Sequence, residues 1–207
     1  KQKTAYEIGV RLVGSEMCIR DRIALMQPIK HLTRTLADLA NAEHYLFMPA
    51  DLRALLPALS EAAFKTLLSR AVCDGHLARV CRGLYLYERV DYPRGLLLFH
   101  AAARVRADTF NYISLETALS DAGVISQIPI QWITLMSAGR SNIIHCGAWG
   151  TIEFVHTRKR PDDVGKELRY DARCHLWRAS VALALQDMRA TRRNMDLVDW
   201  GVVNESV

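Results

Sequence analysis

Apolar and polar positions alternate in two ways along the chain, first with a helical period and later with a strand period. Between residues 23 and 40, apolar side chains recur every three or four positions, the spacing of an amphipathic helix: Leu25, Ile29, Leu32, Leu36 and Leu39. A second helix is predicted to begin at Pro49 and to end before Pro57. A third is predicted from Ser60, a good N-cap residue, to Gly75.

A two-stranded hairpin is predicted directly after the third helix. Residues 76–80 and 84–88 are rich in leucine, valine and tyrosine, and Gly83 between them can adopt a positive φ at the turn. Tyr85 and Tyr87 share one face of the second strand, so we expect them to pack against neighbours. Three helices followed by a hairpin within about 70 residues is the order of elements in a winged helix-turn-helix.

Basic and hydroxyl side chains lie where such a fold contacts DNA. At 100° per residue, the third helix turns one polar face outward, and the hairpin adds two arginines. The candidate DNA contacts are Lys65, Thr66, Ser69, Arg70, Arg79 and Arg82. An ordinary solvated helix face is the alternative interpretation of the helical part of this set. The hairpin arginines favour the DNA-binding interpretation.

The second part of the chain predicts an α+β arrangement. Helices are expected from Pro93 and after Ser114, and strands within 132–136, 142–146 and 151–157, which we interpret as an antiparallel meander. Apolar positions from Asp171 to Met188 predict one long terminal helix, with Asp187 facing outward or flanking its packed side. The fold class is therefore α+β, with a winged-helix domain at 23–91 and a C-terminal domain at 92–207.

The charge of the chain limits the ways in which it could bind DNA. The chain has 207 residues and a net charge of +5. Residues 1–22 hold five of its 27 basic and three of its 22 acidic residues, so 22 basic and 19 acidic residues remain. This segment resembles the translation of a sequencing adapter, particularly in "VGSEMCIRDR", and we exclude it from the functional argument. A remaining net charge of +3 is too small for binding through bulk charge, so DNA contacts must come from a local patch.

Cysteine usage and hydropathy give further expectations. Five cysteines without CxxC spacing argue against a disulfide framework and against a zinc site, so we expect no metal and no cofactor. No apolar run approaches the ~20 residues of a membrane helix, and no signal peptide is apparent, which favours the cytoplasm and no membrane partner.

Catalytic motifs are weak, so we expect a protein that is not an enzyme. The chain has neither a glycine-rich phosphate loop nor a nucleophile elbow. The best alternative is a metal-dependent nuclease built from Glu153, Asp162, Asp163 and Lys166. Three of these residues lie in a Pro/Gly-containing loop, where solvated charges are usual, which disfavours the nuclease.

The order of several segments resembles the AbiEi family antitoxins of bacterial type IV toxin-antitoxin systems. The resemblance is carried by "GHLARVCRGLYLYE", "NYISLETALSDAGVI", "ITLMSAGRSNIIHCGAWGTIEFVHT" and "ALQDMRATRRNMDLVDW", and it spans about residues 28–200. It implies an N-terminal winged helix that binds inverted repeats ahead of its own operon and represses it. It also implies a C-terminal domain that counteracts a nucleotidyltransferase-like toxin without needing a stable complex.

Mapped onto this chain, the resemblance places the DNA contacts on the six residues given above. As the mechanism we expect Arg70 to lie in a major groove, Arg82 to contact the adjacent backbone, and two copies to cooperate on an inverted repeat. Arg140, Arg192 and Arg193 are candidates for contacts with a partner or with phosphate. A solvated helix end is an equally good interpretation of the last two. A stand-alone winged-helix regulator without a toxin partner is the alternative function.

Overall fold

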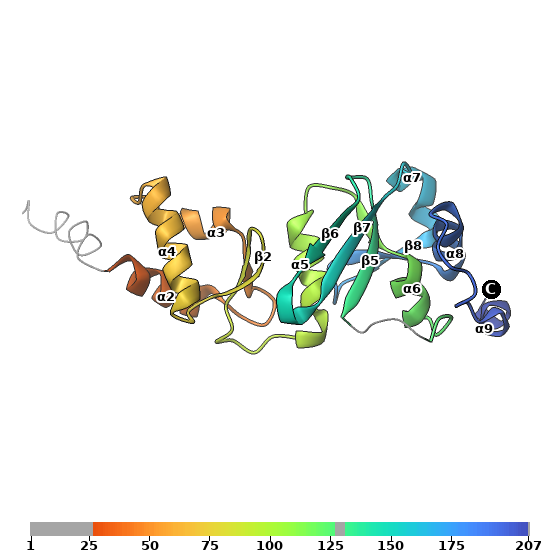
Figure 1. Ribbon diagram of the computed structural model, residues 1–207, viewed down its shortest axis with the longest axis horizontal. Helices are drawn as coiled ribbons and strands as arrows, with labels where there is room; N and C mark the ends of the chain where they lie inside the picture. Colours follow the sequence, from red (N-terminus) through yellow and green to blue (C-terminus); the bar gives the residue numbers. More distant parts are fainter. Residues whose placement is uncertain (1–26, 127–130, 207) are drawn as a thin grey trace, which may run out of the picture.

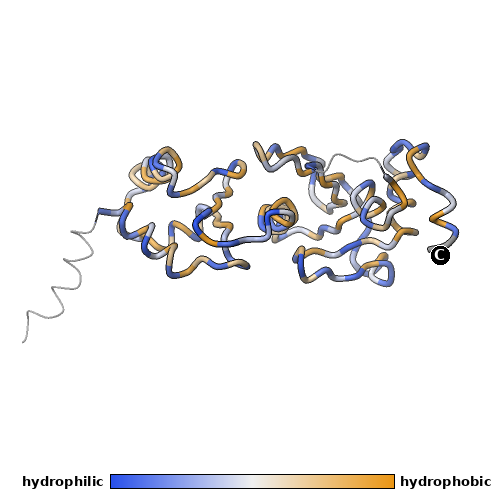
Figure 2. The backbone as a smooth tube through the Cα atoms, turned by 90° about the horizontal axis from the view of Figure 1, so that it is seen from below, coloured by the Kyte–Doolittle hydropathy of each residue, from blue (hydrophilic) through white to orange (hydrophobic). Residues whose placement is uncertain are grey.

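The computed structural model describes residues 27–126 and 131–206, and gives side-chain burial as far as residue 204. The predicted adapter-like segment 1–22 lies outside the described residues. Three helices lie at one end of an elongated molecule and a six-stranded sheet lies toward the other, with helix α5 between them (Figure 1). Hydrophobic stretches occur in both parts of the molecule (Figure 2). The α+β class predicted from the sequence is confirmed.

The second and third helices at the first end follow the predicted boundaries closely. The first begins at Pro28 rather than at residue 23, and Leu25 of its predicted apolar stripe lies outside the described residues. The three helices are α2 (Pro28–Leu39), α3 (Pro49–Ala54) and α4 (Glu61–Cys73). Asp51 accepts a hydrogen bond from the Met48 amide at the start of α3, at 2.8 Å. Ser60 caps α4, because its hydroxyl oxygen accepts from the Ala63 amide at 3.3 Å. Local capping chemistry therefore fixes where these helices begin.

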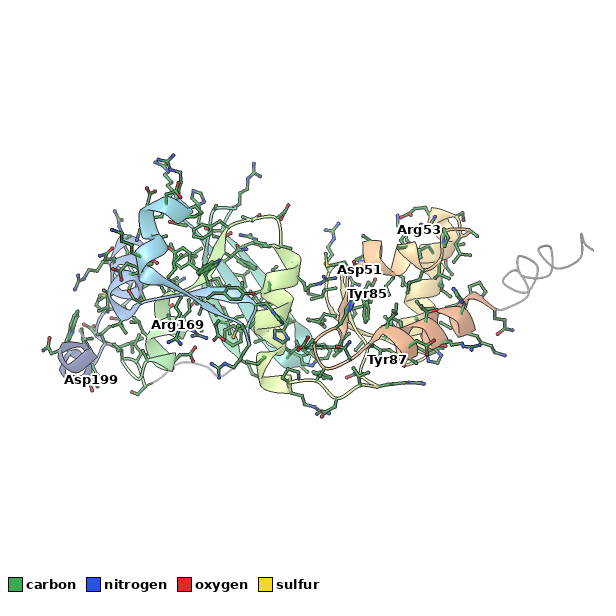
Figure 3. The ribbon with its side chains drawn as sticks, turned by 180° about the vertical axis from the view of Figure 1, so that it is seen from behind. Asp51, Arg53, Tyr85, Tyr87, Arg169 and Asp199 are labelled. Carbon is green, nitrogen blue, oxygen red and sulfur yellow. The ribbon has the colours of Figure 1, made fainter. Side chains whose placement is uncertain are left out.

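A small antiparallel sheet packs against these helices. Its strands are β1 (Leu46–Phe47), β2 (Ala78–Cys81) and β3 (Leu84–Leu86), in the order β1-β3-β2. The predicted turn is confirmed, since Gly83 lies at the tip of the β2–β3 hairpin with φ +79°. Tyr87 is buried with the helices and the half-buried Tyr85 packs beside it, as expected; both are labelled in Figure 3.

The second part combines helices with a larger sheet. After the short 3-10 turn η1 (Arg94–Leu96) come α5 (Leu97–Val105), β4 (Asn111–Ile113) and α6 (Leu115–Asp121). Strands β5 (Trp132–Ser137), β6 (Asn142–His145) and β7 (Thr151–His156) follow, with the 3-10 turn η2 (Gly147–Trp149) before β7. The sheet order is β6-β7-β5-β4-β9-β8.

The prediction of an antiparallel sheet is wrong, because this sheet is mixed. Strand β7 pairs with β5 in parallel and with β6 antiparallel, and β4 pairs in parallel with β9. The reason lies in burial. Ile152 and Phe154 of β7 are buried beside Ile133 and Leu135 of β5, whereas β6 is largely exposed. The strand that buries its side chains takes the inner position, and the exposed strand forms the edge.

The predicted long terminal helix from Asp171 to Met188 is also wrong. After α7 (Pro161–Val164) and η3 (Gly165–Glu167), the chain forms a hairpin of β8 (Leu168–Asp171) and β9 (Leu176–Ala179). Helix α8 covers only Val181–Ala190, and α9 (Trp200–Ser206) follows. His175 in the hairpin turn has φ +55°, which no α-helix contains. Ser180, rather than Asp171, caps α8 and accepts from the Leu183 amide at 3.1 Å.

Two apolar clusters hold the molecule together. The smaller cluster joins α2, α3 and α4 to the helix-facing side of the small sheet, through Leu32, Phe47 and Tyr87 among others. The larger cluster takes residues from both sheets, so that Leu84 and Leu86 of β3 are fully buried with the C-terminal strands and helices. The small sheet is thus packed on both faces. No described helix is long and apolar enough to cross a membrane.

Candidate nucleic-acid interface

Helix α4 has two distinct faces. Phe64, Leu67, Leu68 and Ala71 are buried against α2, α3 and the small sheet. The opposite side exposes the residues predicted to contact DNA and one cysteine: Lys65, Thr66, Ser69, Arg70 and Cys73. The predicted outward face is therefore present as an exposed surface, and its residues are free of the core.

The two arginines of the β2–β3 hairpin lie on the same side of the molecule as one part of the exposed α4 face. Arg79 lies opposite Tyr85 in the β2–β3 pairing, and Arg82 lies in the two-residue connection next to Gly83. Both arginines are exposed. The hairpin is anchored in the core, because Val80 and Leu84 beneath it are at most 2% exposed.

A groove of about 440 Å³ separates α4 from the hairpin. Four of the six predicted DNA contacts line it, two from the helix and two from the hairpin: Lys65, Ser69, Arg79 and Arg82. Its floor is apolar, with Phe64, Leu68 and Val72 among its lining residues. The fold thus brings cationic side chains from two separate elements to the rim of one groove.

Thr66 and Arg70 lie on the other flank of α4. They line a second hollow, of about 580 Å³, together with Pro28 and Ile29 at the start of α2. The structure therefore does not group Arg70 with Arg82. Lys65 and Arg70 are five residues apart, which places them about 140° apart around the helix, with Ser69 between them.

Most of the cationic side chains predicted to contact DNA have no acidic partner among the described residues. Lys65 forms an exposed i,i+4 ion pair with Glu61 at 3.3 Å, an interaction of small free energy. Thr66 donates its hydroxyl to the carbonyl of Ala62 at 3.0 Å within the same helix. Among the described residues, no acidic side chain forms an ion pair with Arg70, Arg79 or Arg82.

The three arginines proposed for partner or phosphate contacts have different surroundings. Arg193 is engaged in the fold, since its guanidinium pairs with Glu153 at 2.5 Å and with Glu116 at 3.5 Å. Arg192 is exposed and has φ +56°. Arg140 is also exposed, and its carbonyl accepts a hydrogen bond from Arg106 at 2.6 Å. Arg193 thus has a structural role, while the other two side chains are exposed.

Two of the four residues of the nuclease alternative take part in ordinary structural contacts, and Asp162 and Lys166 are exposed. Glu153 accepts from the Trp132 indole at 3.1 Å and pairs with Arg193. Asp163 accepts from the Arg160 amide at 2.9 Å at the start of α7. Within 27–126 and 131–206, no group of three or more histidine, cysteine, aspartate or glutamate side chains is arranged to hold a metal ion.

Sequence reasoning missed a buried polar centre beneath α8. Asp187, predicted to face outward or to flank the packed side, is fully buried and accepts from Ser114 at 2.7 Å, from Tyr112 at 3.0 Å and from Lys159 at 2.7 Å. Burial raises the pKa of the Tyr112 hydroxyl, and the neighbouring carboxylate raises it further. The signal was available: Asp187 follows Leu183 and Ala184 at i+4 and i+3, on the apolar side of the helix. Ser114 stands at the N-cap position of α6, but its hydroxyl donates to Asp187 and forms no capping hydrogen bond.

A second buried polar contact joins the small sheet to α5 and to the β8–β9 hairpin. His100 Nε2 lies 2.6 Å from the carbonyl oxygen of Arg173, so this nitrogen carries the proton. Nδ1 of the neutral ring then accepts from the Tyr45 hydroxyl at 2.6 Å. Burial lowers the pKa of His100, which keeps the ring neutral. Asp51 of α3 also pairs with Arg104 of α5, so polar contacts reinforce the shared apolar cluster.

Comparison with known proteins finds no matching family model and no significant match among curated proteins.

Proposed function

We propose that residues 27–91 form a winged helix that binds double-stranded DNA, and that the protein is a transcriptional regulator. The groove between α4 and the β2–β3 hairpin supports this proposal most directly, because Lys65, Ser69, Arg79 and Arg82 converge on it from two elements. In this arrangement α4 is the recognition helix and the hairpin is the wing.

The exposed face of α4 suits a major groove. Ser69 occupies the middle of the face, where a short side chain lets the helix approach base edges. Lys65 and Arg70 stand on its two flanks, in position to contact the phosphates of opposite strands. Arg79 and Arg82 of the wing then contact the backbone beside the groove. In this proposal Arg70 binds phosphate on the flank away from the wing.

The test is a binding titration against duplex DNA from upstream of the protein's own gene, measured by fluorescence anisotropy at several salt concentrations. Arg82→Ala and Lys65→Ala are expected to weaken binding to all duplexes and to lower the salt slope by about 0.9 for each lost phosphate contact. Ser69→Ala is expected to change sequence preference with an almost unchanged slope.

Arg169→Ala is the matched control, because Arg169 is an exposed arginine on β8, away from the groove (Figure 3). It removes the same charge and should leave the slope unchanged. If Arg82→Ala and Arg169→Ala bind DNA with the same affinity and slope as the unaltered protein, the site assignment is wrong. Binding that falls equally in both variants would point to bulk charge instead.

From the resemblance to AbiEi antitoxins, we further propose that the protein acts in the cytoplasm, binds an inverted repeat as a cooperative pair and represses its own operon. The C-terminal part would counteract a nucleotidyltransferase-like toxin. Co-expression with the neighbouring gene tests this: rescue of growth supports an antitoxin. A toxic neighbour without rescue, or an unrelated operon, supports a stand-alone regulator. In either case we propose a binding role rather than a catalytic one.

A further inference from the structure

A small hollow with aromatic walls lies at one end of the larger sheet, beside the turn of the β8–β9 hairpin. Its volume is about 210 Å³, and it is lined by α5 and the loop after it, by the start of β4 and by the hairpin. Tyr170 of β8 and Trp177 of β9 pair across the two strands and are 49% and 44% exposed. Their rings pack edge to face, with centroids 5.4 Å apart. We call this space the aromatic hollow; its lining includes Arg106, Phe110, Asn111, Tyr170, His175 and Trp177.

One buried polar atom in this lining has no partner. Asn111 is 7% exposed, and its side-chain nitrogen donates to the carbonyls of Arg106 at 2.8 Å and Thr109 at 2.6 Å. These two bonds fix the carboxamide, because the reverse orientation would set its oxygen against two carbonyl oxygens. Oδ1 is thereby left buried and without a hydrogen-bond donor among the described residues. An unpaired buried acceptor is costly, so a ligand that brings an N–H group to Oδ1 gains a favourable bond.

The other polar groups of the aromatic hollow differ in how far the fold already uses them. Arg106 is engaged, since its guanidinium donates to the Ser137 hydroxyl at 2.8 Å and to the Arg140 carbonyl at 2.6 Å. In the part of the chain that the structure describes, neither the Trp177 indole nor the exposed His175 ring forms a hydrogen bond. The described lining contains no lysine and no carboxylate. The hollow therefore suits a neutral ligand that has both a donor and acceptors.

Size and aromatic character narrow the ligand further. The hollow is smaller than the roughly 300–1,000 Å³ of pockets for drug-sized molecules, which leaves room for one planar ring. Aromatic side chains bind such rings by stacking, and every nucleobase has a face that can stack. Cytosine also carries an exocyclic amino group as donor, next to ring nitrogen and carbonyl acceptors. An apolar ring would stack equally well but would leave the Asn111 oxygen unpaired.

We propose that the aromatic hollow binds a nucleobase that carries an exocyclic amino group, with cytosine as the best fit. The amino group donates to Asn111 Oδ1, the ring stacks against Trp177, and His175 donates to an acceptor of the ring. A free nucleoside and a base in a single strand present the same groups, and the experiment below separates the two. The proposal does not depend on the binding of duplex DNA by α4.

The test is a calorimetric titration of the full chain with cytidine, followed in parallel by quenching of tryptophan fluorescence. Trp177→Ala is expected to weaken binding about fivefold or more, because the stacking partner is lost. Trp200→Ala is the matched control, since Trp200 is 45% exposed on α9, lies against Arg189 and is outside the hollow. It should bind cytidine as tightly as the unaltered protein does.

A change in the ligand tests the Asn111 contact without altering the protein. Cytidine dimethylated on its amino group keeps the ring but has no N–H there, so it should bind about tenfold or more weakly than cytidine. Equal binding of the two ligands, equal binding by Trp177→Ala and the unaltered protein, or no binding of cytidine at about 5 mM would overturn the proposal.

A short deoxycytidine oligomer identifies the source of the base. Tighter binding of the oligomer than of cytidine assigns the hollow to a base in a single strand, and equal binding per base assigns it to the free nucleoside. None of these titrations contains duplex DNA, so a failure here is distinct from a failure of the proposed regulator function.

Discussion

The ion pair between Lys159 and Asp187 offers a quantitative test of the C-terminal fold. The Asp187 carboxylate is fully buried, and the Lys159 side chain is 31% exposed. In Lys159→Met the carboxylate keeps only the hydroxyl donors of Tyr112 and Ser114. Breaking a fully buried pair costs about 3–5 kcal/mol. Because Lys159 retains partial solvent contact and two donors remain, we expect a loss of about 2–3 kcal/mol in the free energy of unfolding.

The assay is urea unfolding at pH 7, followed by circular dichroism and compared with calorimetry. The Tm should fall by roughly 5–10 °C. The double variant Lys159→Met/Asp187→Leu removes both charges, and it should be more stable than the sum of the single changes predicts, by about 1 kcal/mol or more. Lys166→Met, at an exposed lysine in η3, is the control and should lie within about 0.5 kcal/mol of the unaltered protein. A Lys159→Met variant as stable as the Lys166→Met variant would refute the reasoning.

Three further predictions concern stability. Burial raises the pKa of Asp171, but hydrogen bonds from Arg173 and Arg178 outweigh this effect and lower the pKa from 3.8 to about 2. The contribution of Asp171 to the free energy of unfolding is therefore present above pH 3.8 and is lost as the pH falls through 2. Acid titration should show the unaltered protein and Asp171→Asn differing by up to about 2 kcal/mol at pH 7 and converging near pH 2; a constant difference would contradict this. Gly83→Ala should lower stability by about 1 kcal/mol in thermal unfolding, because φ is +79° while the added Cβ meets open space; an unchanged Tm would contradict it. Ser180→Ala should cost about 1 kcal/mol by loss of the α8 cap, measured by urea unfolding, with a change below about 0.3 kcal/mol contradicting the cap.

Local signals in the sequence located the first three helices and the hairpin. Pro49, Ser60 and Gly83 act through their own backbone or their nearest neighbours, so their effects can be predicted without knowing the fold. The same is true of the exposed face of α4, since helical periodicity alone turns Ser69 and Arg70 outward. Periodicity alone could not predict that the exposed face of α4 is divided between two hollows, with Lys65 facing the hairpin and Arg70 lying on the opposite flank.

The errors came from tertiary packing. The apolar spacing from Asp171 onward also fits two short strands, and the long-range pairing of Trp177 with Tyr112 selects the strands. The order of the strands likewise depends on which of them buries its side chains against β5. The competing strands are far apart in the sequence, so local patterns could not predict the outcome. The prediction that Asp187 faces outward or flanks the packed side failed because its partners are far away in sequence, with Lys159 28 residues before it.

The two-sided packing of the small sheet has a consequence for any attempt to isolate residues 27–91, which we propose to bind DNA. A fragment ending near residue 91 would bring the undersides of Leu84 and Leu86, both fully buried in the intact chain, into contact with water. Such a fragment would self-associate through this apolar surface unless it were redesigned with polar side chains. The first third of the protein is therefore not expected to fold correctly as an isolated fragment. To transfer the proposed DNA contacts to another scaffold, the exposed residues of α4 and the hairpin tip should be moved rather than the whole segment.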